Sequence, residues 1–137
     1  MLNDANVKDY MSANVTTFSP EMRIEHAIDQ FIDKRISSAP VIDHTGDLVG
    51  MLTERDCMKI ALSSGYYEET AGKVSEYMQP APKTIAADAS IVEVASMFSE
   101  DDHRRYPVVE DNCLVGEISR RDVLKALRTL WVHCPNC

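Results

Sequence analysis

The chain has 137 residues, 45% of them hydrophobic, and its 22 acidic and 14 basic residues give a formal net charge of −8. A chain of this length buries about two thirds of its unfolded surface, so it needs neither a metal nor a disulfide to fold. The acidic balance argues against a broad surface for nucleic acid or an anionic membrane, although it allows a small anion in a locally basic pocket.

Compartment signals point to the cytoplasm. No window is long and apolar enough for a membrane span, and the first residues lack the basic and apolar regions of a secretory signal. The four cysteines, Cys57, Cys113, Cys134 and Cys137, do not form a disulfide framework. We therefore expect a cytoplasmic protein that contacts neither membrane nor nucleic acid.

One unit is written twice along the chain. Residues 7–11 (VKDYM) recur as 74–78 (VSEYM), and the segment 53–56 (TERD) recurs as 119–122 (SRRD). The second spacing is one residue shorter than the first, which places a deletion in an intervening turn, where deletions cost least. The predicted organisation is a first repeat over 1–66, a linker over 67–73, a second repeat over 74–131 and a tail over 132–137.

The first half of each repeat is predicted to be a short extended stretch followed by a helix. In the first copy residues 15–18 are extended, and Ser19 and Pro20 resemble a helix cap with proline at the first helical position. Apolar residues then recur at helical spacing from Ile24 to Ile32. In the second copy Asp88 or Ser90 is placed to cap the corresponding helix.

The second half of each repeat is predicted to be a hairpin running into a closing helix. Two apolar runs, 39–42 and 48–52, flank a turn that contains glycine, and a helix begins near Thr53 and ends near 63–65. Its counterpart begins near Ser119. The fold class is therefore α/β (α+β): two β-α-β-β-α repeats, packed sheet to sheet around a pseudo-twofold axis because one repeat alone buries its apolar face poorly.

The junction between hairpin and closing helix carries the chemistry. A hydroxyl residue is followed three positions later by an aspartate, Thr53 with Asp56 and Ser119 with Asp122. This is the pattern of a capping box, although aspartate is less usual there than glutamate or glutamine. A purely structural interpretation is therefore available for both pairs.

Three features add a binding interpretation to the structural one. The pair occurs at symmetric positions, an arginine precedes each aspartate (Arg55 and Arg121), and a helix start offers backbone N–H groups to an anion. An aspartate that accepts hydrogen bonds from vicinal hydroxyls is a common way to hold a ribose. Capping and binding are compatible, so both interpretations stay open at this point.

The sequence resembles a tandem pair of cystathionine-β-synthase (CBS) domains over nearly the whole chain, from Val7 to about Leu130. The resemblance is carried by the repeated segments 7–11 and 74–78, by 35–43 and 104–109, and by the two Gly-x-x-Ser/Thr-x-x-Asp stretches. It implies a stand-alone regulatory module that binds an adenosyl ligand such as AMP, ADP or ATP between the repeats. It implies no enzymatic activity, no required cofactor and no bound metal.

The resemblance also implies ligand-binding positions. Asp56 and Asp122 would hold ribose hydroxyls, with Thr53 and Ser119 beside them, and each pocket would take its aspartate from one repeat and its adenine wall from the other. The adenine-wall and pocket positions are Ile36, Ser37, Ala39, Arg104, Arg105, Tyr106, Thr17 and Thr84. Four arginines near the second motif (Arg104, Arg105, Arg120 and Arg121) favour a ligand that bears phosphate over the cationic S-adenosylmethionine.

The sequence also suggests partners for the protein and two alternative functions. A homodimer formed through the helices and an effector protein that reads the ligand state are expected. The alternative is an interaction scaffold whose motifs only cap helices. A third hypothesis, a zinc or redox role for Cys134 and Cys137 in the tail, lacks a second pair of ligands. No nucleophile, P-loop or dinucleotide motif is present.

Overall fold

The computed structural model describes residues 4–62 and 72–132, and its contacts divide the chain into two compact units. Unit 1 comprises Met1–Val15 and Lys83–Cys137, and unit 2 comprises Thr16–Pro82. The α+β class predicted from the sequence is confirmed, since each unit holds one small sheet with helices against it. The predicted helix end at 63–65 and most of the linker lie outside the described residues.

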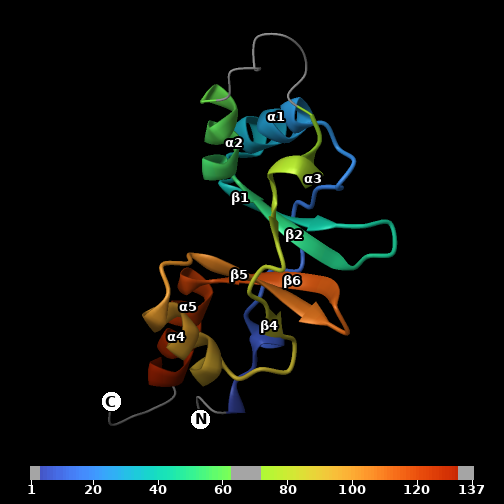
Figure 1. The fold of residues 1–137 in the computed structure, drawn as a ribbon. Helices are drawn as coiled ribbons and strands as arrows, with labels where there is room; N and C mark the ends of the chain where they lie inside the picture. The colour runs from blue at the N-terminus through green and yellow to red at the C-terminus, as the bar shows by residue number, and fades with distance from the viewer. Residues whose placement is uncertain (1–3, 63–71, 133–137) are drawn as a thin grey trace. The chain divides into compact units, whose positions relative to one another are not determined.

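Unit 2 contains the first hairpin and its helices (Figure 1). Its described elements are α1 (Ile24–Lys34), β1 (Ser38–Ile42), β2 (Leu48–Thr53), α2 (Glu54–Ala61), α3 (Val74–Tyr77) and β3 (Gln79–Pro80). The strands form a sheet in the order β1-β2-β3, and both pairs are antiparallel. The two strands of the hairpin are therefore those predicted, and a third strand joins them from a later part of the chain.

Unit 1 repeats this plan with the second hairpin. Its described elements are η2 (Val7–Asp9), β4 (Ile85–Ala86), α4 (Ile91–Glu100), β5 (Arg105–Glu110), β6 (Cys113–Ser119) and α5 (Arg120–Val132). The sheet order is β4-β5-β6, with β4 parallel and β6 antiparallel to β5.

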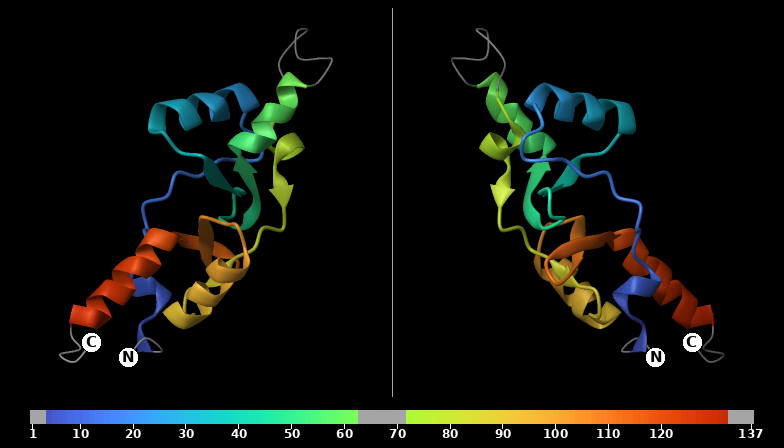
Figure 2. Two further views of the ribbon diagram at one scale, coloured as in Figure 1. Left: turned by 90° about the vertical axis from the view of Figure 1, so that its left-hand side faces the viewer. Right: turned by 90° about the vertical axis from the view of Figure 1, so that its right-hand side faces the viewer.

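Each unit encloses a core between its sheet and its helices. Helices α1 and α2 lie together beside the β1–β2 hairpin in all views, as α4 and α5 do beside β5 and β6 (Figure 2). In unit 2, Phe18 and Phe31 meet edge to face with ring centroids 5.3 Å apart. In unit 1, the rings of Phe98 and Tyr106 lie 4.7 Å apart. Burial of these apolar faces supplies the main driving force for folding.

Two predicted helix starts have different outcomes. Helix α1 begins at Ile24, with Arg23 as an N-cap whose side chain makes no capping hydrogen bond, so the predicted Ser19–Pro20 cap is wrong. The Ser19 hydroxyl instead accepts a hydrogen bond from the backbone N–H of Glu21 at 3.2 Å, within a turn. Ser90 does cap α4, as predicted, by accepting from the backbone N–H of Glu93 at 3.2 Å.

The predicted apolar patterns are also corrected at two places. Residues 15–18 form no strand in the described structure, and Phe18 makes only an isolated parallel bridge to Val41. The equivalent segment of the second copy does form a strand, β4. Ile32, placed by its spacing on the buried face of α1, is 68% exposed because it lies at the edge of the apolar stripe.

The opening segment of each sequence repeat packs in the core of the other repeat's hairpin. Val7 is fully buried among Ile85, Tyr106 and Ile118 of unit 1. Val74 is fully buried in unit 2, in the same cluster as Phe18. The compact units therefore do not coincide with the repeats read along the sequence, because the two copies exchange their first segments.

Two strand glycines allow these exchanged segments to approach the sheets. A Cβ added at Gly50 of β2 would lie 2.5 Å from Met78 Sδ and 3.0 Å from the carbonyl oxygen of Gln79. At Gly116 of β6 it would lie 2.6 Å from Met11 Sδ and 2.8 Å from the carbonyl oxygen of Ser12. At Gly116 the Ser12 carbonyl oxygen leaves no room for a side chain, whereas at Gly50 Met78 and the Gln79 main chain would have to shift, so glycine is favoured at both positions.

Gly116→Ala should therefore lower the free energy of unfolding by about 1–3 kcal/mol, the usual cost of overpacking a close contact. Chemical denaturation followed by circular dichroism measures the change. Ser96→Ala on the exposed side of α4 is the matched control and should leave stability within about 0.5 kcal/mol. A Gly116→Ala protein as stable as the wild type would show that the 7–12 segment does not pack tightly on β6.

Candidate functional site

The candidate site of each unit lies where the second strand of the hairpin passes directly into a helix. Thr53 ends β2 and is the N-cap of α2, and Ser119 ends β6 immediately before α5. The chain makes this turn without a loop, so the helix start and the strand end share one point. Both copies of the motif occupy this same local position.

In unit 2 the predicted capping box is present. The backbone N–H of Asp56 donates to Thr53 Oγ1 at 3.1 Å, and the backbone N–H of Thr53 donates to Asp56 Oδ2 at 2.9 Å. The Thr53 hydroxyl also lies 2.9 Å from Asp56 Oδ2, as a donor to it. The structural interpretation of the first motif is thus confirmed.

Unit 1 contains the same pair of capping bonds. The backbone N–H of Asp122 donates to Ser119 Oγ at 3.2 Å, and the backbone N–H of Ser119 donates to Asp122 Oδ2 at 2.9 Å. Among the described residues, no hydrogen bond reaches Asp122 Oδ1. Asp122 is partly exposed whereas Asp56 is 1% exposed. One carboxylate oxygen of the second motif is therefore available to a ligand.

The structure also brings the segment before each hairpin to the motif of the same copy. The Ser37 carbonyl accepts from the backbone N–H of Glu54 at 2.9 Å, and the Arg104 carbonyl accepts from that of Arg120 at 3.1 Å. Strand pairing adds Ser38 opposite Thr53. The predicted adenine-wall segments therefore adjoin their own motifs, while their pairing with the other repeat's aspartate stays a prediction.

These contacts reduce the anion-binding capacity expected of the helix starts. In α2 the N–H groups of Glu54 and Asp56 are taken by Ser37 and Thr53. In α5 the N–H groups of Arg120 and Asp122 are taken in the same way. Fewer first-turn amides are therefore open to a phosphate than the sequence argument assumed, and phosphate recognition must rely more on side chains.

Asp56 has an additional partner that sequence reasoning missed. The carboxamide Nε2 of Gln79, on β3, lies 3.2 Å from Asp56 Oδ1 and 3.4 Å from Oδ2, donating to both. Lys59 Nζ lies 3.6 Å from Oδ1. Both carboxylate oxygens of the first motif are consequently occupied by groups of unit 2 itself.

Glu117 is a second residue that the sequence analysis did not single out. Its side chain, on β6, is 12% exposed, and Oε1 forms an ion pair with Arg105 Nη1 at 3.2 Å. Its Oε2 is buried without a hydrogen-bond partner. Burial raises the pKa of Glu117 above its usual value, with a smaller rise from the charge of Asp122, although Arg105 lowers it. The corresponding residue of the first copy is Met51, so no repeat signal marked this position.

The arginines near the second motif have different roles. Arg105 is paired with Glu117, and Arg120 Nε donates to the His103 carbonyl at 2.9 Å. Arg104 and Arg121 are exposed and make no side-chain hydrogen bond or ion pair within the described part of the chain. Two of the four predicted phosphate ligands are therefore engaged in holding the structure, and two remain open. Arg55, next to the first motif, is exposed as well.

A hydrogen-bonded cluster around Asp101 fixes the loop before β5. Lys83 Nζ and the Tyr106 hydroxyl donate to Asp101 Oδ2 at 2.7 Å and 2.9 Å. Lys83, followed by Tyr106, lowers the pKa of Asp101. Tyr106 is fully buried, and desolvation together with Asp101 raises its pKa to about 12. Its side chain thus belongs to the core, and it can present only main-chain groups to a ligand.

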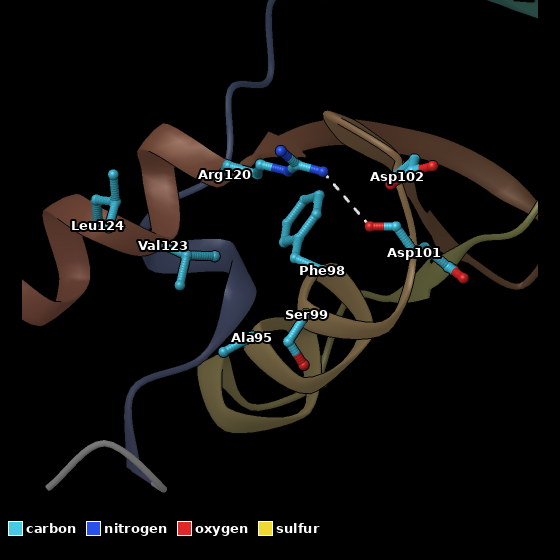
Figure 3. Close-up of a pocket in the computed structure, with 8 residues that line it drawn as sticks. All are labelled: Ala95, Phe98, Ser99, Asp101, Asp102, Arg120, Val123 and Leu124. Carbon is cyan, nitrogen blue, oxygen red and sulfur yellow. Dashed lines mark hydrogen bonds between the residues drawn. The ribbon is translucent and has the colours of Figure 1, made fainter.

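A pocket of about 470 Å³ lies between α4 and α5 (Figure 3). Its polar wall contains Asp101, Asp102 and Arg120, and its apolar wall includes Phe98 and Leu124. Figure 3 shows the Arg120 guanidinium turned toward the main-chain oxygen of Asp101, which accepts from Nη2 at 3.4 Å. Arg120 is the one predicted ligand-binding residue that lines it, so this pocket does not contain Ser119 or Asp122.

The remaining predicted positions lie along the hairpins. Ala39 is fully buried in the core, so any ligand contact there would use its backbone. Ile36 is half-buried and Ser37 exposed, both just before β1. Thr17 precedes Phe18, whose backbone pairs with Pro40 and Ile42, and Thr84 is exposed directly before β4.

Reactive or metal-binding centres are not evident in residues 4–62 and 72–132. No three His, Cys, Asp or Glu side chains of this described part are grouped as metal ligands, and the Cys134–Cys137 tail lies outside it. Burial raises the pKa of the Cys57 thiol to about 11, so it is almost entirely protonated at neutral pH and a poor nucleophile. No described helix is long and apolar enough to cross a bilayer.

Glu117→Gln should raise the free energy of unfolding at pH 7. Because the pKa of Glu117 is raised in the folded state, its protonated form is favoured there, so its contribution to stability is present at low pH and lost as pH rises. Glutamine keeps the neutral form at every pH, so the gain should be larger at pH 7 than at pH 4 in urea titrations. The exposed Glu93→Gln is the control. A loss of stability at pH 7 would mean that the Arg105 pair outweighs the cost of burial.

Comparison with known proteins identifies the family of this site. The model of the CBS domain matches residues 7–63 and 74–129. The chain is 28% identical over 125 residues to the uncharacterized protein MJ1225 of Methanocaldococcus jannaschii, covering 91% of this chain but only 44% of that protein.

Solved structures agree on the fold. The crystal structure of CBSX2 in complex with AMP superposes with a TM-score of 0.81 at 24% identity, covering 93% of this chain and 98% of the other. The CBS domain pair of MJ0100, in complex with 5′-methylthioadenosine and S-adenosyl-L-methionine, gives 0.74 at 27% identity, covering 92% and 98%. With two matched domains, two capped aspartate motifs and this fold, the chain belongs to the CBS domain family as a tandem CBS pair.

Proposed function

We propose that the protein is a regulatory module that binds an adenine nucleotide through Asp122 and signals its presence to an effector protein. The observation that most supports this proposal is in the second motif. Two capping bonds hold the Asp122 carboxylate in place, and Asp122 Oδ1 has no partner among the described residues. A rigidly held carboxylate with an open oxygen suits the vicinal hydroxyls of a ribose. Ser119 Oγ and the main chain at Arg104 adjoin it.

The open arginines favour a phosphate-bearing ligand. Arg121 lies within the Ser119–Asp122 motif, the Arg104 carbonyl accepts from the backbone N–H of Arg120 in that motif, and both arginine side chains are exposed. A guanidinium matches phosphate geometry with two parallel hydrogen bonds, so AMP, ADP or ATP suits this surface better than a sulfonium compound does. The AMP complex of CBSX2 supports a nucleotide, while the MJ0100 complex shows that a CBS pair also accommodates adenosyl compounds without phosphate.

Regulation fits the chemistry of the site better than catalysis does. The carboxylates of Asp56 and Asp122 are both engaged in helix-capping hydrogen bonds, and the buried thiol of Cys57 has a raised pKa. A ligand that binds one arrangement of the protein more tightly than another shifts the population toward it, and a cytoplasmic partner would read that shift. The same module without a ligand would be a scaffold, and the experiment below separates the two.

A thermal-shift panel with AMP, ADP, ATP and S-adenosylmethionine tests the proposal. A ligand at a hundredfold excess over its Kd adds about 2.7 kcal/mol, which corresponds to several degrees in Tm. We expect a nucleotide to give this shift in the wild type and in the exposed control Asp88→Asn. Asp122→Asn, which keeps an oxygen for the cap, should lose it. Flat responses throughout the panel would overturn nucleotide binding and favour the scaffold.

We also propose that the protein forms a homodimer through its helices. In unit 1, Leu124 and Trp131 of α5 are 62% and 64% exposed. In unit 2, Met58 and Leu62 at α2 are exposed as well. Large apolar side chains on the helical surface of both units are typical of a covered interface.

Leu124→Glu should weaken the dimer at least tenfold, because it places a charge in an apolar contact. Sedimentation velocity over a range of concentrations measures the change. The neighbouring exposed residue provides a control for charge alone, since Lys125→Glu makes a larger change in net charge on the same helix. A monomer at all concentrations in the wild type, or equal weakening by both variants, would contradict this interface.

A further inference from the structure

Gln79 presents to Asp56 the same chemistry that a ribose would. Its carboxamide Nε2 donates across both carboxylate oxygens, at 3.2 Å to Oδ1 and 3.4 Å to Oδ2. Vicinal ribose hydroxyls would donate to the same two atoms. Thr53 and Lys59 also contact this carboxylate, so both of its oxygens already have partners. Asp56 is also only 1% exposed.

The second copy lacks this contact. The residue that corresponds to Gln79 at the 67-residue spacing is Ser12, which pairs with Glu117 through its backbone, at 2.9 Å in each direction. No side chain of the described residues bonds to Asp122 Oδ1. The two motifs thus have the same backbone frame and the same capping bonds, and they differ in whether a neighbouring side chain covers the carboxylate.

We propose that Gln79 is a specificity-determining residue that keeps the first motif closed to ligand, so that the chain binds one adenosyl ligand, at Asp122. This inference rests on the proposed function, since it assigns the ligand to one of two similar motifs. It gives Asp56 a structural role, in which its side chain joins the start of α2 to β3.

The closure is a matter of affinity rather than of permanent burial. Gln79 is exposed, and its strand is held to β2 by backbone pairing of Gln79 with Met51. Its side chain can therefore turn into solvent without unfolding β3. A ligand at Asp56 must first displace two charge-assisted contacts, which weakens its apparent affinity about tenfold or more.

Exchanging the two corresponding residues provides the test. Gln79→Ser gives the first motif the side chain of the second, and Ser12→Gln does the reverse. Isothermal titration with AMP, and separately with ATP, measures stoichiometry and affinity on the full chain. Asp122→Asn in the wild-type and Gln79→Ser backgrounds locates each bound ligand. Urea titration of every variant confirms that it remains folded.

The inference predicts a distinct result for each variant. The wild type should bind one nucleotide per chain and lose it in Asp122→Asn. Gln79→Ser should gain a second site that persists when Asp122→Asn is added, and Ser12→Gln should weaken the original site about tenfold. Gln30→Ser on α1, at a half-buried position away from both motifs in sequence, is a composition-matched control and should behave as the wild type.

Other outcomes separate the two proposals. Two nucleotides bound by the wild type with equal affinity would overturn the role of Gln79 and leave nucleotide binding intact, as would a Gln79→Ser protein that still binds one and loses it with Asp122→Asn. One nucleotide bound by the wild type and retained in Asp122→Asn would place the ligand elsewhere and overturn the inference. No binding of AMP or ATP to any folded variant would overturn the proposed function itself.

Discussion

The reciprocal bond between a cap residue and the aspartate three positions later determines how each site is built. It joins the last residue of a strand to the first turn of a helix, at Thr53 with Asp56 and at Ser119 with Asp122. Because the carboxylate is fixed by the backbone, its second oxygen has a defined direction. The segment before the hairpin is drawn to the same point through the Ser37 and Arg104 carbonyls. The capping arrangement is therefore compatible with the proposed recognition of a ligand by the same carboxylate.

The two copies have the same frame and differ in the side chains around it. Their backbones, caps and strand glycines correspond, but the first has Met51 and Gln79 where the second has Glu117 and Ser12. The Asp56 carboxylate is buried and both of its oxygens have partners. The Asp122 carboxylate is partly exposed, and nearby Glu117 has a buried oxygen, Oε2, without a hydrogen-bond partner in the described structure. The residues of the neighbouring strands thus determine which groups contact the aspartate, although the motif itself is the same in both copies.

Local patterns in the sequence predicted the hairpins, the closing helices and both capping boxes, because these depend on residues close together in the chain. The Ser19–Pro20 cap failed because the start of α1 is bonded to a segment distant in sequence, through the backbone N–H of Ile24 and the carbonyl of Gly72. Gln79 and Glu117 escaped notice for a different reason. Each acts on residues supplied by another element, and neither is repeated in the other copy. The sequence also did not reveal that Arg105 and Arg120 have partners within the described part of the protein while Arg104 and Arg121 do not, because those partners come from other elements.

Because the two copies exchange their opening segments, one repeat alone does not contain all the residues of either core. A chain consisting of the first repeat alone would lack the residues around Val74 that fill its core and would carry residues around Val7 that fit another. Two such half-chains would complete each other only by meeting in solution, at a concentration-dependent cost. Joining them in one polypeptide replaces that encounter with a high effective concentration, after which the side chains around the two motifs are free to diverge.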